Sequence, residues 1–416
     1  MSNLLDRGAF NKRVTNFLFG LFIFSVFFPF IKIVSFTDIQ PTTLGLAILI
    51  FLIYPQKILS RPIIVLGFGF LFSLFLVSIS KWGMGSARNA ISYISMFFIP
   101  AAVYLVMRCQ EGFKEVYLKW SIYILFCVGF IQTFLIKDFL SFLLPRINTS
   151  SGRGVVGLAP EPTTYGIMCL FLMFICYLYK PKKMVFYQML LLIQILIFAK
   201  SGTIVILLMI WGILYICFFF SIKRLVLGLL MLSFSFVWLT PFLVHTRMYK
   251  IVNLLITDPQ FLFIKDMSGS ARFFHVFFSV LGALQNFLIP NGFSSYAAYL
   301  SENLIYYPTY IQQSLRFNGI TDKVMSGYGA ALFEMGFVGL IFPIVLWFLL
   351  KRFFASNIRA FLMMSVVITV TIFCAIPLAF PYIGFLYGFL AYYSVRKSKL
   401  HPQTETSIKS KVSLGD

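Results

Sequence analysis

Long apolar segments recur along the whole chain, and short polar segments separate them. A run of about 20 apolar residues is long enough to cross the hydrocarbon core of a bilayer as a helix. The pattern predicts twelve such spans, of which the second and the seventh are short. They cover residues 17–35, 41–56, 62–80, 90–107, 117–136, 162–179, 184–199, 201–220, 225–243, 328–350, 360–376 and 378–394. We therefore expect an all-α polytopic membrane protein.

The composition excludes the main soluble classes of protein. Apolar residues make up 60% of the 416 residues and charged residues only 11%, whereas about 25% of the residues in a soluble domain are charged. This composition excludes a soluble enzyme, a small disulfide-rich protein and a disordered protein. A membrane β-barrel would show short alternating segments instead of continuous apolar runs.

The residues that usually bind metals or form disulfides show no organised pattern. The six cysteines lie in or beside apolar runs without a CxxC pair, and the three histidines, His245, His275 and His401, are scattered. Cysteine is a common small packing residue in apolar surroundings, and a zinc site needs clustered ligands. We therefore expect no disulfide, no metal and no cofactor.

The net charge of +21 comes from 34 basic and 13 acidic residues. In a membrane protein such an excess is typical of cytoplasmic loops, which collect lysine and arginine. With the N-terminus inside, the twelve spans leave 21 basic residues inside and 13 outside, and every short inside loop is basic. The charge therefore predicts a multi-pass topology with both termini cytoplasmic. It does not point to nucleic acid as a partner.

The predicted spans divide the chain into transmembrane and loop segments. Residues 1–136 hold spans 1–5, 162–243 hold spans 6–9, and 328–394 hold spans 10–12; 137–161 and 244–327 are long extracytoplasmic loops, and 395–416 is a cytoplasmic tail. A transporter usually keeps its connections short and its site at mid-membrane. Two long loops on one face instead indicate chemistry or binding outside the cytoplasm.

The apolar segment 271–289 inside the second loop carries one polar stripe. Its polar positions recur at spacings of three and four, which places them on one helix face: Arg272, His275, Ser279, Gly282 and Asn286. A full crossing here would move the basic loop 351–359 and the tail outside, so we exclude it. Two interpretations remain open. The amphipathic helix either lies in the interface with its stripe toward water, or packs over the bundle with Arg272 and His275 facing a wet cavity.

The first long loop ends in Glu161-Pro162, which opens a helix. Proline suits the first helical position, so Glu161 is either a helix-start residue favoured by the dipole or a functional carboxylate. Arg146 and Arg153 flank a Ser/Thr/Gly stretch just upstream. Beside them, the Glu161 carboxylate could orient a guanidinium or accept a proton.

Arginines are also spread through the second loop, at Arg247, Arg272 and Arg316. Arginine presents a planar donor fork to phosphate oxygens and keeps its charge at any pH. The pattern indicates an anionic ligand such as a lipid phosphate or pyrophosphate; the alternative is contact with phospholipid headgroups. Glu334, one turn into the tenth span, is either functional, as ionisable groups inside spans usually are, or a helix-rim residue.

Four short motifs follow one another along the chain. They are Arg153–Pro162 with Tyr165-Gly166, which resembles R-x-x-G-hydrophobic-x-x-E-P with one extra residue between Arg153 and Gly157; the polar turn Lys200–Thr203; Gly269–Arg272 with Pro290–Phe293; and Gly329–Gly336, which resembles L-x-x-E-x-G with one residue fewer between Leu332 and Glu334. Each motif is short and degenerate, but their order and the loop placement cover nearly the whole chain. In this order they resemble the O-antigen polymerase and ligase superfamily.

The resemblance implies a lipid-linked-sugar glycosyltransferase (GT-C type) architecture in the cell inner (plasma) membrane, with the active site on the extracytoplasmic side. Such enzymes transfer a sugar chain from a polyprenyl diphosphate to an acceptor hydroxyl without a metal. The polymerases extend lipid-linked repeat units, and the ligases attach the polymer to lipid A core. Ligases carry a histidine late in the large loop, and residues 293–328 contain none, which favours a polymerase.

The resemblance also implies the partners and the site. The substrate is a polyprenyl-diphosphate-linked oligosaccharide in membrane lipid, and a chain-length regulator and a flippase are expected functional partners. Arg153 and Arg272 are the first candidates to stabilise the departing pyrophosphate, while Glu161 and His275 are the candidate general bases. The substrate-binding candidates are Arg146, Arg316, Arg88 and Tyr165.

Two other functions remain open from the sequence: an O-antigen ligase of the same superfamily and a flippase for lipid-linked oligosaccharide. A flippase should carry charged residues inside its spans and have two related halves, and the sequence shows neither pattern. The expected function is therefore the joining of lipid-linked repeat units into a surface polysaccharide.

Overall fold

The computed structural model describes residues 2–33, 39–54, 59–79, 84–147, 154–219, 253, 256–257, 267–316 and 324–400. All regular secondary structure in these residues is helical. The first half comprises α1 (Ser2–Phe27), α2 (Thr42–Ile53), α3 (Arg61–Ile79), α4 (Met84–Cys109), α5 (Glu115–Phe134), η1 (Ser141–Leu143), α6 (Pro162–Tyr179), α7 (Met184–Ile193), the π-helix η2 (Gln194–Ala199) and α8 (Gly202–Phe219).

The second half begins with three helices of the long loop, α12 (Met267–Gln285), α13 (Tyr296–Asn303) with η3 (Leu304–Tyr306), and α14 (Thr309–Arg316). It continues with α15 (Gly327–Met335), η4 (Gly336–Leu340), α16 (Ile341–Phe353), α17 (Ile358–Ala375) and α18 (Pro381–Leu400). Pro377 lies between the last two helices, since α17 ends at Ala375 and α18 begins at Pro381.

Seven of the described helical segments are long and apolar enough to cross a membrane. They are Arg61–Ile79, Ser86–Cys109, Glu115–Phe134, Pro162–Tyr179, Gly202–Phe219, Gly327–Phe353 and Ile358–Ala375. Three shorter apolar helices cover Val14–Phe27, Thr42–Ile53 and Met184–Ala199. Helices thus lie at eleven of the twelve predicted spans, and the ninth, 225–243, lies outside the described residues. The number that cross a membrane stays a prediction.

The helices differ from the predicted spans at three places. The first span was expected to reach residue 35, but α1 ends at Phe27, just before Pro29, because proline cannot continue the hydrogen bonding of a helix. The last helix runs to Leu400, six residues into the segment 395–416 expected to be a tail. The tenth span is not continuous but is interrupted at Gly336.

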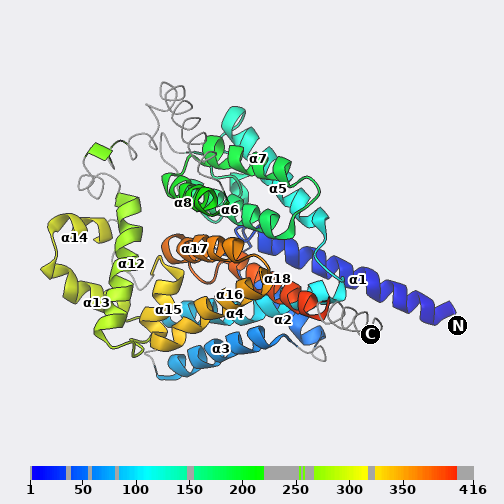
Figure 1. Ribbon diagram of the computed structural model, residues 1–416, viewed down its shortest axis with the longest axis horizontal. Coiled ribbons are helices and arrows are strands. Elements are labelled where there is room, and N and C mark those ends of the chain that lie inside the picture. The colour runs from blue at the N-terminus through cyan, green and yellow to red at the C-terminus, as the bar shows by residue number, and fades with distance from the viewer. Residues whose placement is uncertain are drawn as a thin grey trace, which may run out of the picture.

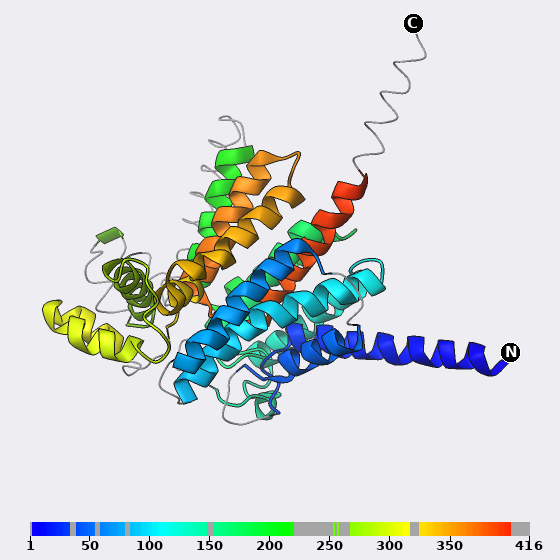
Figure 2. The same cartoon turned by 90° about the horizontal axis from the view of Figure 1, so that it is seen from below.

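The long helices form a bundle, and the loop helices gather at one end of it. Within the bundle, α4 packs against α2, α3 and α18, and α6 packs against α7, η2 and α8. In both views α12, α13 and α14 lie together, at the opposite end of the molecule from α1 (Figures 1 and 2). The elements of the second long loop therefore cap one end of the bundle.

The polar stripe of α12 faces inward. His275 and Ser279 are buried, and α12 packs against α14, α15 and α17. The opposite face exposes Phe273, Phe277 and Leu284. The interpretation with the stripe toward water is therefore wrong, and the helix packs over the bundle end. An exposed face of aromatic and aliphatic residues is suited to lipid contact.

The contact between α12 and α15 depends on glycine. A Cβ atom on Gly282 would lie 2.7 Å from Cε2 of Phe333, and one on Gly329 would overlap Oγ of Ser279. The missing side chains let the two backbones approach closely, as small residues do between membrane helices. The polar stripe is therefore also the packing surface of α12.

The interruption of the tenth span is covered by the turn that follows α12. Gly336 adopts φ +60°, and its missing side chain leaves room for the Leu288 carbonyl. The Leu288 carbonyl accepts a hydrogen bond from Phe337 N–H at 2.8 Å, while Asn291 and Gly292 donate backbone N–H groups to Phe333 and Glu334 at 3.1 Å. These bonds satisfy backbone groups that a break inside a span would otherwise expose.

We predict that Gly329→Ala destabilises the protein, because the new methyl group meets Ser279 and Ser326. Overpacking of this kind costs about 1–3 kcal/mol. Gly45→Ala in α2 is the matched control, since nothing lies within 4 Å of its added Cβ, and alanine is favoured over glycine in a helix by roughly 0.5–1 kcal/mol. Thermal unfolding in detergent measures both. Equal melting temperatures for the two variants would contradict the close packing of α12 on α15.

Candidate functional site

The segment before α6 is anchored by α5. Gly157 has φ +59°, and its backbone is held on both sides by Gln132 of α5. The Gly157 N–H donates to Oε1 of Gln132 at 2.8 Å, and Nε2 of Gln132 donates to the Gly157 carbonyl at 3.0 Å. A Cβ on Gly157 would also lie 2.7 Å from the Tyr165 ring. Gly157 of the motif Arg153–Pro162 is therefore needed for both its backbone conformation and its space.

The same segment is held by the end of η2 and the turn after it. Val155 N–H donates to the Phe198 carbonyl at 2.8 Å, and a Cβ on Gly154 would overlap that carbonyl. Oγ of Ser201 donates to Oγ1 of Thr163 at 3.2 Å. The motif around Glu161 and the polar turn Lys200–Thr203 are thus in direct contact, although 38 residues separate Ser201 from Thr163.

Glu161 starts α6 without capping it. Its backbone is extended, Pro162 occupies the first turn, and its side chain makes no capping hydrogen bond. Instead, Oε2 of Glu161 lies 3.8 Å from a terminal nitrogen of Arg272 on α12. The expected helix start is confirmed, and the carboxylate is directed to an arginine of the other long loop.

The Arg272–Glu161 ion pair is partly shielded from solvent. The side chains are 15% and 24% exposed, so their attraction is screened less than that of a surface pair. The carboxylate can hold the guanidinium in one orientation, and the planar donor fork of a guanidinium is also suited to phosphate oxygens. The two long loops therefore meet in a group that is suited to phosphate chemistry and still accessible.

His275 lies one turn after Arg272 but is enclosed. It is 3% exposed, and its ring lies 5.5 Å from the ring of Tyr296 at an interplanar angle of 30°. Tyr296 also donates its hydroxyl to the His275 carbonyl at 3.5 Å. This placement in the packing between α12 and α13 favours Glu161 over His275 as the group that meets a substrate.

The loop tyrosines near this histidine remain protonated. Burial raises the pKa of Tyr296 and raises that of Tyr299 to about 12. Oη of Tyr299 donates to Oε1 of Gln285 at 2.8 Å. Both phenols therefore act as hydrogen-bond donors and not as bases. Among the described tyrosines of this loop, Tyr306 and Tyr310 are the exposed ones.

The other sequence candidates are not gathered at this pair. Arg88 at the start of α4, Arg146 after η1 and Arg316 at the end of α14 are exposed on three different elements. Arg153 lies outside the described residues, as does Arg247. The assignment of Tyr165 to substrate binding needs correction, because Tyr165 is fully buried and its hydroxyl donates to the Leu125 carbonyl and to Gln194.

Glu334 belongs to a second buried group. It is 3% exposed and accepts hydrogen bonds of 2.5 Å from Nδ2 of Asn89 and from Oη of Tyr93, both on α4. The Tyr93 ring also stacks on Phe293, 5.8 Å away at 16°. The Glu334 side chain is therefore enclosed within the protein. The depth of Glu334 in a span pointed to a role, but nothing in the sequence indicated its partners on α4.

The site residues offer no obvious place for a metal. No group of three or more His, Cys, Asp or Glu side chains with metal-binding geometry occurs among the described residues. The chain matches no known family model, and no curated protein is similar enough to it to suggest a function.

We predict that Tyr93→Phe destabilises the protein by about 1.5–3 kcal/mol, the usual contribution of a hydrogen bond to a charged group. The change leaves the buried Glu334 carboxylate with one donor fewer. Tyr104→Phe, at a buried position of the same helix, is the control, since the Tyr104 hydroxyl makes no hydrogen bond with the described residues. Denaturant unfolding measures the difference. A Tyr104→Phe variant as unstable as Tyr93→Phe would exclude a specific role for this bond.

Proposed function

We propose that this protein is a polysaccharide polymerase that joins polyprenyl-diphosphate-linked oligosaccharide repeat units on the outer face of the inner membrane. The observation that carries the proposal is the Arg272–Glu161 pair, in which the two long loops meet. Both residues belong to motifs that resemble the O-antigen polymerase and ligase superfamily. The all-helical fold with seven long apolar helices is compatible with such an enzyme.

The proposed reaction is one glycosyl transfer. The oxygen of an acceptor hydroxyl attacks the anomeric carbon of the donor, and the bond from that carbon to the diphosphate oxygen breaks. The electron pair of this bond leaves with the polyprenyl diphosphate, and the hydroxyl proton passes to a base. The protein must therefore supply cationic donors for the leaving group and an acceptor for the proton.

Arg272 is the proposed donor and Glu161 the proposed acceptor. Arg272 is partly buried, so its interaction with the growing negative charge on the diphosphate is stronger than it would be in water. Glu161 stands at the N-terminus of α6, where the helix dipole favours anions. Its carboxylate also fixes the guanidinium, which reduces the reorganisation needed during the reaction.

A polymerase is favoured over a ligase, because the second long loop carries no histidine after His275. A flippase is disfavoured, because the pair lies between two long loops and not in the middle of the spans. We place both termini on the cytoplasmic side and the Arg272–Glu161 pair outside, in agreement with the distribution of basic residues.

We predict that Arg272→Ala lowers the rate of polymerisation by about 100- to 1000-fold, as expected when one donor to a developing charge is removed. Arg272→Lys should recover little of this loss, because lysine lacks the planar fork. Arg359→Ala, at an exposed position at the start of α17, is the control and should keep full activity. Chain length on a glycan gel measures the effect, with membrane insertion checked by immunoblot. Normal polymer from a well-inserted Arg272→Ala variant would remove this residue from the mechanism.

Deletion of the gene in its host distinguishes the candidate functions. We expect the surface glycan ladder to collapse to a single repeat unit on its final acceptor, since export and attachment still operate. Full-length polymer that stays on the polyprenyl carrier would instead indicate a ligase. Repeat units held on the cytoplasmic face would indicate a flippase, and an unchanged ladder would contradict all three functions.

A further inference from the structure

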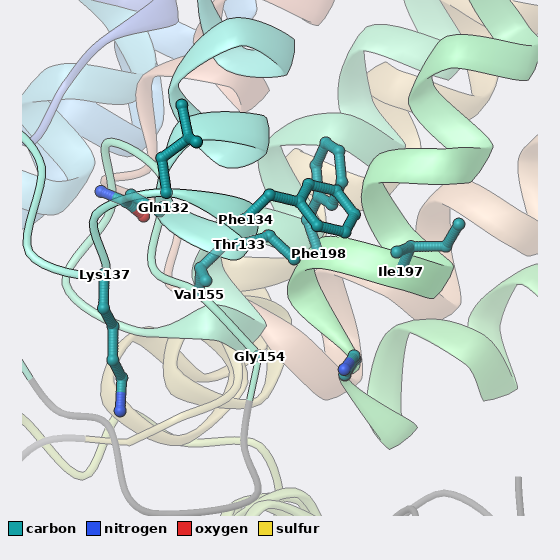
Figure 3. A pocket seen from close by; sticks show the side chains of 10 residues that line it. Gln132, Thr133, Phe134, Lys137, Gly154, Val155, Ile197 and Phe198 are labelled. Carbon is teal, nitrogen blue, oxygen red and sulfur yellow. The ribbon is translucent and has the colours of Figure 1, made fainter. Parts of the chain in front are cut away.

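A small open cavity lies at the ends of α5 and η2. Its volume is about 290 Å³, and its walls come from α5, the residues after it, η2 and the start of the segment before α6 (Figure 3). The lining residues are Gln132, Thr133, Phe134, Leu135, Lys137, Gly154, Val155, Ile197, Phe198 and Lys200. This volume is at the lower limit for ligand sites, about 300 Å³, and suits a headgroup better than an oligosaccharide.

One wall of this cavity is apolar and faces away from the bundle. Phe134, Leu135 and Ile197 are 60%, 72% and 45% exposed. The ring of Phe134 lies 6.2 Å from the ring of Phe198, in an edge-on arrangement at 82°. In a membrane-spanning bundle such an exposed surface contacts lipid chains. The cavity is thus continuous with a surface along which an apolar chain can lie.

The other side of the cavity is cationic. Lys137 and Lys200 both line it and are exposed, and neither ammonium pairs with a carboxylate among the described residues. The backbone of Lys200 is held in place, because it adopts φ +48° and its N–H donates to the Ile195 carbonyl at 3.1 Å. Figure 3 shows the Lys137 side chain directed away from the rings of Phe134 and Phe198.

Helix dipoles explain only part of this arrangement. A lysine after the last turn of a helix is favoured by the negative end of the dipole, and each lysine follows such an end, that of α5 or η2. That effect does not explain why both line one cavity beside an apolar wall. In the proposed topology both also lie on the outer side, and Lys200 lies in a short connection, where basic residues are usually few.

We propose that this cavity binds the phosphate headgroup of a membrane lipid, with Lys137 and Lys200 on the phosphate oxygens and the lipid chain along Phe134, Leu135 and Ile197. Two lipids share this chemistry, a glycerophospholipid and a polyprenyl diphosphate. The cavity and the Arg272–Glu161 pair are linked by one short segment, since Gly154 lines the first and Glu161 belongs to the second. The lipid site does not depend on the proposed function, because its residues take no part in the transfer.

The test uses the purified full-length protein in detergent and three probes: farnesyl diphosphate, phosphatidylglycerol and inorganic pyrophosphate. Titration followed by native mass spectrometry gives the dissociation constant of each. We expect the double variant Lys137→Ala/Lys200→Ala to bind the lipid probes at least tenfold more weakly, and Lys137→Arg/Lys200→Arg to keep the affinity. The control is Lys182→Ala/Lys183→Ala, which removes two exposed lysines between α6 and α7 and should change the affinity less than twofold.

The three probes separate the possible sources of the ligand. Tighter binding of farnesyl diphosphate assigns the site to a prenyl carrier, and equal or tighter binding of phosphatidylglycerol assigns it to the surrounding phospholipid. The proposal is overturned if the Lys137/Lys200 alanine variant binds both lipids like the unchanged protein, or if the control variant loses as much affinity. It is also overturned if inorganic pyrophosphate binds as tightly as farnesyl diphosphate, because the apolar wall would then contribute nothing.

Discussion

The interruption of the tenth span at Gly336 is the constraint on which the rest of the site depends. A break in a membrane helix exposes backbone N–H and C=O groups, and in lipid these groups have no water to bind. The turn after α12 supplies the missing partners through Leu288, Asn291 and Gly292. Phe287 and Leu288 adopt left-handed backbone conformations in this turn, which few residues other than glycine accept unless the surroundings impose them.

This turn fixes the position of α12 and therefore of Arg272. The helix ends at Gln285, just before the turn, and Arg272 lies 13 residues earlier, or about 20 Å along the axis at the rise of an α-helix. Gly282 packs closely against Phe333, and Gly329 against Ser279. These two contacts hold the helix along this length. On the other side, Gln132 and Phe198 hold the segment that leads to Glu161. Two independent supports thus bring the two charged side chains together.

The sequence predicts much of the fold but little of the assembly of the site. Apolar runs of about 20 residues locate the helices well, since length and hydrophobicity are local properties. The polar stripe of α12 was also visible, but its direction depended on Ser279 and Gly282 packing against α15, which is a tertiary property. The same limit applies to Tyr165, where an aromatic residue beside a motif suggested binding, while its hydroxyl is used inside the bundle. The partners of Glu334 are 241 and 245 residues away in the chain, beyond the reach of any spacing rule.

The most direct test of the proposed function is reconstitution of the purified protein in liposomes with polyprenyl-diphosphate-linked repeat units as the only substrate. The Arg272–Glu161 site predicts a ladder of products longer than one unit, together with release of polyprenyl diphosphate in proportion to the bonds formed. The Arg272→Ala variant should leave the substrate at one unit under the same conditions. If the folded protein fails to elongate the substrate, or if both proteins produce the same ladder, the assignment of a polymerase site to this pair is wrong.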